Sequence, residues 1–97
     1  MFKLRWSREA EAAYHLLRSN PSEKKRYKTV KKTVEFLASN PRHSSLQTHE
    51  YVSLIGPNKE KVFTAYAEQK TPAAYRGFWY YGPEKGIITI FAITSHP

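Results

Sequence analysis

The segment AYRGFWYYGPEKGIITIFAI, residues 74–93, predicts the central hairpin of the fold. Its aromatic half, 74–81, has the composition of a strand, and 82–86, with two glycines and a proline, is typical of a turn. The half that follows, 87–93, is apolar at every position but one. This pattern is typical of a central strand that is covered on both faces.

The other elements are predicted from the periodicity of apolar residues. Residues 2–6 and 61–69 alternate as strands do, and 49–54 can form a further short strand. Residues 8–19 have helical spacing, and a second helix begins at Asn20-Pro21 and ends before Pro41. Residues 70–72 form the turn after 61–69. The order β-α-α-β-β-β predicts one α+β domain over 1–97, with an N-terminal helical hairpin packed on a mainly antiparallel sheet.

Composition excludes several classes of protein. The 97 residues include no cysteine, so disulfides and thiolate metal sites are excluded. No apolar region near the N-terminus resembles a signal peptide, and no apolar run approaches the ~20 residues of a membrane span. We therefore expect a cytoplasmic protein without a membrane partner.

Charge is the strongest feature of the composition. Sixteen Lys and Arg face eight Glu, for a formal net charge of +8, and residues 1–48 hold eleven of the cations against four Glu. Such a field favours a polyanionic partner, with nucleic acid first and an acidic protein second. A basic surface that serves only solubility is the alternative.

The basic residues concentrate in KKRYKTVKK, residues 24–32 of the second helix. The apolar stripe of that helix leaves its cations on the outer arc, where they can contact a phosphate backbone. A solvated helix face is the alternative. The residues predicted to bind nucleic acid are Lys24, Lys25, Lys28, Lys31, Lys32 and Lys61.

Arg76 lies inside the aromatic strand, between Tyr75 and Phe78. An unpaired arginine is costly to bury, so this side chain faces water or a partner. A guanidinium here can bind a phosphate through two hydrogen bonds and stabilise a charged transition state. A structural ion pair with Glu60 or Glu68 is the alternative.

Titratable side chains next to the predicted strands suggest acid–base chemistry. His49 and His96 each adjoin a strand and could act as base and acid in RNA cleavage. Tyr66 could move a proton or stack on a base, although aromatic residues of a sheet more often belong to the core. His15 is expected in packing or on the surface, and His43, which lies in a loop, is expected to be exposed to solvent. No spacing typical of a metal site is present, so no metal is predicted.

Four motifs in this order resemble the RelE/ParE superfamily of bacterial toxins. They are the Ala-Tyr-x-x-Leu of the first helix, the segment NPRHSSLQTH at 40–49, the Tyr-Arg that opens the aromatic strand, and the apolar last strand that leads to a histidine. The resemblance covers nearly the whole chain. It implies a small antiparallel sheet with two N-terminal helices packed on it.

The resemblance also implies two kinds of activity. RelE-like members cleave mRNA in the ribosomal A site without a metal, and ParE-like members inhibit DNA gyrase without cleaving RNA. An antitoxin that wraps the toxin neutralises members of both kinds.

Site residues implied by the resemblance are Arg76, which matches the arginine that contacts the reacting phosphate, and His96, which matches the C-terminal histidine of YoeB-like members. The sequence departs from the family pattern at Pro97, where YoeB-like enzymes have a catalytic tyrosine. It also departs near Thr64 and Tyr66, where RelE-like members have two lysines.

We therefore expect a toxin that is a cofactor-independent mRNA endoribonuclease acting at the ribosome. Arg76 and His96 are its expected catalytic residues, and His49 and Tyr66 are expected to assist them. Its expected partners are a cognate acidic antitoxin, mRNA and ribosomal RNA. The alternatives are a gyrase inhibitor and a family member without toxicity.

Overall fold

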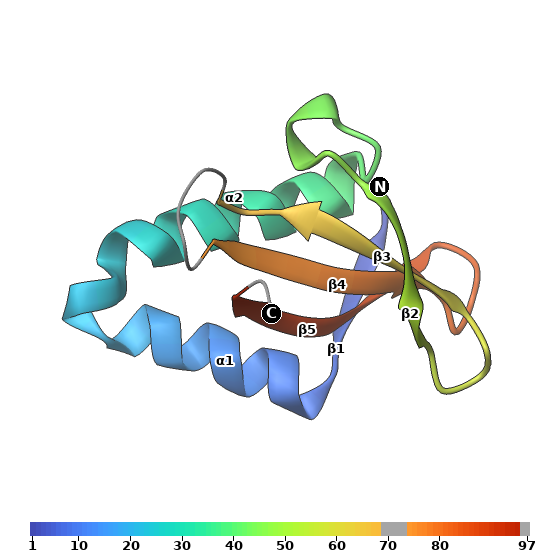
Figure 1. Cartoon of the computed structure of the whole chain (residues 1–97), viewed down its shortest axis with the longest axis horizontal. Coiled ribbons are helices and arrows are strands. Elements are labelled where there is room, and N and C mark those ends of the chain that lie inside the picture. The colour runs from blue at the N-terminus through green and yellow to red at the C-terminus, as the bar shows by residue number, and fades with distance from the viewer. Residues whose placement is uncertain (69–73, 96–97) are drawn as a thin grey trace.

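A five-stranded sheet forms the centre of the computed structural model, which describes residues 1–68 and 74–95 (Figure 1). The strand order is β1-β5-β4-β3-β2, and every neighbouring pair is antiparallel except β1 and β5. The strands are β1 (Lys3–Trp6), β2 (His49–Ile55), β3 (Lys61–Tyr66), β4 (Tyr75–Tyr81) and β5 (Ile87–Ser95).

Two helices, α1 (Arg8–Ser19) and α2 (Lys24–Ser39), cover one face of this sheet (Figure 1). The chain enters α2 through a 3₁₀ turn, η1 (Pro21–Glu23), and a second such turn, η2 (Ser44–Leu46), precedes β2. The predicted two-layer α+β class is confirmed.

The main hydrophobic core lies between the helices and the sheet. Apolar residues at helical spacing in α1 and α2 meet alternate residues of the central strands, as their periodicities require. Its most buried members are Ala10, Leu17, Val30, Leu37, Leu46, Ala65, Trp79, Ile88, Ile90 and Ile93.

Strand β5 carries a bulge at Phe91, because Trp79 pairs with Ile90 whereas Phe78 pairs with Ala92. The extra residue reverses the direction of the side chains that follow it. Ile88 and Ile90 therefore face the helices before the bulge, and Ile93 does so after it.

Ser7 fastens the start of α1 to this bulge. Its hydroxyl accepts a hydrogen bond from Ala10 N (3.0 Å), which caps the helix, and donates one to the Phe91 carbonyl oxygen (2.7 Å). Its backbone N–H also bonds to the Ile90 carbonyl oxygen at 2.9 Å. One N-cap residue thus fixes the helix to the central strand.

A second apolar cluster forms on the sheet face opposite the helices. Val62, Phe78 and Tyr80 are buried there, and β2 contributes Tyr51, whose ring meets that of Phe78 edge-on at 5.1 Å. Strand β2 can place Tyr51 over this face of the sheet because its pairing with β3 is irregular between Glu50 and Ile55. This face is therefore only partly open.

The ends of several elements differ from the prediction. Strand β3 ends at Tyr66 rather than at residue 69, and the predicted turn 70–72 lies outside the described residues. Asn20 caps as expected, through Ser22 N, but the first turn is 3₁₀ and Glu23 pairs with Arg26. No helix within the described ranges is long and apolar enough to cross a membrane.

The two helices provide a matched test of the core. Leu37 of α2 is 1% exposed and Leu16 of α1 is 70% exposed. We expect Leu37→Ala to lower the free energy of unfolding by about 2–5 kcal/mol, because it leaves a cavity. Leu16→Ala should change it by less than about 0.5 kcal/mol. Urea unfolding measures both, and equal effects would contradict the helix orientation.

Candidate active site

Arg76 and Tyr66 face each other on neighbouring strands of the partly open face. They are paired residues of β4 and β3, and the Arg76 guanidinium carbon lies 4.4 Å from the centre of the Tyr66 ring. Tyr66 is an even number of residues from Val62 on β3, and Arg76 is an even number from Phe78 on β4. Because Val62 and Phe78 face away from the helices, Tyr66 and Arg76 do so too. The tyrosine thus contacts the guanidinium through its aromatic face, and the N–H donors have no hydrogen-bond partner among residues 1–68 and 74–95.

The charge of Arg76 has no carboxylate partner among the described residues. Glu68 is engaged by the Arg26 Nε at 3.0 Å, and Glu60 accepts from Asn58 N at 2.8 Å. The ion pair with Glu60 or Glu68 considered from the sequence is therefore not formed. A half-buried guanidinium that no described carboxylate neutralises favours an anionic ligand.

His49 joins this pair at the start of β2. Its ring lies 5.8 Å from that of Tyr66, and its register partner is Thr64 of β3. Nδ1 donates to the Gln47 carbonyl oxygen at 3.0 Å. Because a carbonyl only accepts, the neutral ring carries its proton on Nδ1, and Nε2 is an acceptor that lies 3.3 Å from the Thr64 hydroxyl oxygen.

The backbone at Gln47 makes this arrangement possible. Gln47 follows η2 with a left-handed conformation (φ 48°, ψ 44°), which is rare for a residue other than glycine. Its carbonyl orients His49 two residues later. Such conformations cost ~1–3 kcal/mol and cluster at functional sites.

A groove of about 420 Å³ adjoins the cluster on the same face. Thr94, the register partner of Arg76 on β5, is one of its walls. Thr94 reaches this face because the bulge at Phe91 reverses β5. The other lining residues are Tyr51, Ser53, Leu54, Phe78, Ala92 and Ser95.

The remaining predicted site residues lie elsewhere. His96 and Pro97 are outside the described residues. Lys61 begins β3 and Tyr66 ends it, which places their backbones roughly 16 Å apart along the strand. The structure therefore brings together Arg76, Tyr66 and His49, and it leaves Lys61 apart.

The α2 cations are divided between the surface and the interior. Lys24, Lys25, Lys28, Lys31 and Lys32 are all exposed. Arg26, which the sequence suggested on the same outer arc, instead faces inward.

Arg26 links α2 to the far ends of β3 and β4. It contacts Glu23 at 3.1 Å and Glu68 at 3.0 Å, and it stacks over the Tyr75 ring at 4.4 Å. Burial alone would lower the pKa of Arg26, but the hydrogen bond and charge of Glu68 outweigh it and raise this pKa above its usual value. Glu68 also accepts from Tyr75 N at 3.0 Å.

The aromatic residues of β4 belong to packing, which was the commoner alternative. Trp79 and Tyr80 are 0% and 6% exposed, and Tyr75 stacks with Arg26. Tyr66 is the aromatic residue of the predicted set that contacts both Arg76 and His49.

His43 differs from its predicted exposed position. It is half-buried, and its ring stacks on Phe36 of α2 with centres 4.1 Å apart. It also caps η2, since its Nδ1 accepts from Ser45 N at 3.1 Å. Histidine is an uncommon cap, so the sequence offered no signal of this role.

The described residues contain no group of three or more His, Cys, Asp or Glu that could hold a metal ion. The chemistry that they do support is phosphate binding by Arg76 beside a histidine acceptor, Nε2 of His49.

Comparison with known proteins bears on the fold. No protein-family model and no curated protein matches this sequence. A solved structure, the YoeB/ParE toxin from Agrobacterium tumefaciens, superposes with a TM-score of 0.72 over 99% of this chain and 100% of its own. The two proteins share a fold. At 8% identity the likeness confirms the RelE/ParE-like fold that the motifs suggested.

The Arg26–Glu68 pair predicts a measurable coupling. Glu68→Gln should lower the free energy of unfolding by about 1–3 kcal/mol, because it weakens the hydrogen bonds of Arg26 and of Tyr75 N. A double-mutant cycle with Arg26→Gln should give a coupling of ~1 kcal/mol. Glu84→Gln, in an exposed turn, is the control. Strictly additive effects would contradict the pairing.

Proposed function

We propose that this protein is the toxin of a toxin–antitoxin pair and acts as an endoribonuclease on mRNA at the ribosome. The observation that carries the proposal is the guanidinium of Arg76, which pairs with no carboxylate in the described ranges and lies against Tyr66 on the partly open face of a RelE/ParE-like fold. His49 adjoins the same tyrosine and supplies a proton acceptor.

The proposed reaction is transphosphorylation within the RNA. A base removes the proton of a 2′-hydroxyl, whose oxygen attacks the adjacent phosphorus. The bond from phosphorus to the 5′-oxygen breaks, and an acid protonates that oxygen. The products are a 2′,3′-cyclic phosphate and a 5′-hydroxyl, so the reaction balances without a co-reactant.

Each residue has a proposed role in this reaction. Arg76 holds the scissile phosphate and stabilises the charge that builds on it in the transition state. His49 receives the 2′-hydroxyl proton at Nε2, since Nδ1 is occupied by Gln47. His96, or the phenol of Tyr66, protonates the leaving oxygen.

The surroundings of the cluster suit single-stranded RNA. The groove beside Thr94 offers the partly exposed ring of Tyr51, on which a splayed base can lie. The exposed lysines of α2 supply sequence-independent attraction to phosphates of mRNA and ribosomal RNA. The same positive field suits an acidic antitoxin as partner.

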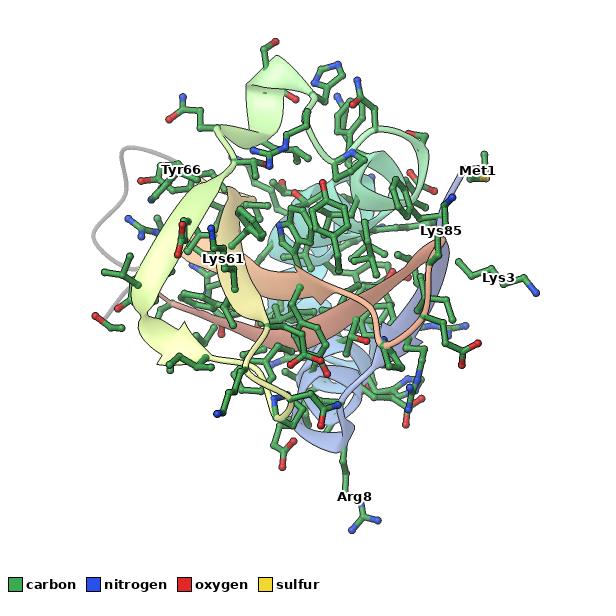
Figure 2. All side chains as sticks on the ribbon, turned by 90° about the vertical axis from the view of Figure 1, so that its right-hand side faces the viewer. Met1, Lys3, Arg8, Lys61, Tyr66 and Lys85 are labelled. Carbon is green, nitrogen blue, oxygen red and sulfur yellow. The ribbon has the colours of Figure 1, made fainter. Side chains whose placement is uncertain are left out.

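The proposal predicts the outcome of expression in cells. Inducing the protein should produce new 5′-hydroxyl ends within coding regions, and Arg76→Ala should reduce them by ~10²-fold or more, because the transition-state charge loses its donor. Mapping of mRNA 5′ ends measures this. Arg8→Ala is the control, since Arg8 is exposed at the start of α1 (Figure 2).

Unchanged transcripts and growth with the parent protein would contradict the proposal. A supercoiling assay with purified protein then tests the gyrase alternative. Inhibition of gyrase that survives both Arg76→Ala and His49→Ala would favour a binding inhibitor over a nuclease.

A further inference from the structure

A pocket of about 340 Å³ lies between α2, the η2 segment and the end of β3. Its floor is the buried Leu46, and its aromatic wall is the stacked pair of Phe36 and His43. The described residues that line it include no carboxylate. They are Thr29, Lys32, Thr33, Phe36, His43, Ser45, Leu46, Tyr66 and Ala67.

The polar lining includes two side chains that can donate hydrogen bonds to a ligand, His43 and Lys32. His43 Nδ1 accepts from Ser45 N (3.1 Å) and lies 2.7 Å from Ser45 Oγ, so the neutral ring carries its proton on Nε2. This is the opposite tautomer to that of His49. Lys32 adds an ammonium group, 5.8 Å from the centre of the Phe36 ring. A donor N–H next to a cation suits a phosphate.

Tyr66 connects this pocket to the candidate active site. It lines the pocket, and it also contacts Arg76 and His49. The connection exists because β2 pairs with β3 only up to Thr64, which leaves the edge of β3 at Ala65 and Tyr66 without a strand beside it. A chain bound at Arg76 can therefore pass over this edge to α2.

We propose that this pocket binds the nucleotide next to the scissile phosphate, with Lys32 and His43 Nε2–H at its phosphate and the base against the aromatic wall. The inference rests on the proposed function, because it assumes that a single RNA strand occupies Arg76 and the pocket together. It adds His43, Phe36 and Lys32 to the residues that contact the substrate.

The volume and lining favour a nucleotide. A site of this size matches the lower end of small-ligand pockets, ~300–1,000 Å³. Two threonine hydroxyls, Thr29 and Thr33, donate to helix carbonyl oxygens and remain able to accept from a base or ribose. Aromatic side chains beside cations are the usual means of binding single-stranded RNA.

The test uses a short single-stranded RNA with 2′-O-methyl groups throughout, which binds without being cleaved. Its affinity for the full-length protein is measured by fluorescence anisotropy over a range of salt concentrations. Lys32→Gln should reduce the slope of log affinity against log salt by ~0.7, as expected for one lost phosphate contact on a single strand. His43→Asn keeps an acceptor for Ser45 N and removes the ring, and should weaken binding roughly five- to tenfold.

Two control variants are matched to these. Lys3→Gln removes an exposed lysine at the opposite sheet edge, and His15→Asn removes an exposed histidine of α1 (Figure 2 labels Lys3). Both should retain the parent slope and affinity. Circular dichroism shows whether each variant is folded.

The outcomes separate the pocket from the active site. Weaker binding by Arg76→Ala, Lys32→Gln and His43→Asn, with unchanged controls, supports the inference. If Arg76→Ala weakens binding but the two pocket variants match the controls, the pocket inference is overturned and the proposed nuclease stands. If the pocket variants weaken binding and Arg76→Ala does not, two proposals are overturned: that one RNA strand occupies both places, and that Arg76 binds the phosphate.

Discussion

The bulge at Phe91 keeps the buried isoleucines of β5 on the face of the sheet that the helices cover, although their spacing changes from two residues to three. Before the bulge, Ile88 and Ile90 fill the core beneath the helices; after it, Ile93 resumes that role. Ser7 donates hydrogen bonds from its hydroxyl to the Phe91 carbonyl and from its backbone N–H to the Ile90 carbonyl, and these bonds fix α1 to the sheet. The same reversal turns Thr94 toward the partly open face, beside Arg76. Core packing and site geometry therefore share one local irregularity.

The second requirement of the site is a positive charge without a partner. Glu68 does not pair with Arg76, because its carboxylate pairs with Arg26 and accepts a hydrogen bond from Tyr75 N. Arg26 holds α2 to the ends of β3 and β4, and Arg76 on the other face keeps its charge for a ligand. Both arginines stack on a tyrosine. Within the part of the chain that the structure describes, Arg26 pairs with carboxylates and Arg76 does not.

Much of the fold followed from sequence because it depends on local periodicity. Apolar spacing and turn residues predicted the helix at 8–19, a second helix that ends before Pro41, and the central hairpin. The proximity of Arg76, Tyr66 and His49 depends on the register of the strands. A bulge in β5 and an irregular pairing of β2 with β3 determine that register, and neither can be predicted from the spacing of apolar residues. The inward position of Arg26 and the stacking of His43 depend on contacts between elements distant in sequence. Periodicity carries no information about either.

The central claim is that Arg76 is the phosphate-binding group of this face. The most direct measurement is a titration of the ¹⁵N-labelled protein with a nucleoside 2′,3′-cyclic monophosphate, followed through the arginine Nε–Hε signals by NMR. The account predicts that the Arg76 signal shifts and saturates, whereas the signal of Arg26, held by Glu68, does not move. A stationary Arg76 signal, with shifts confined to other arginines, would contradict the account.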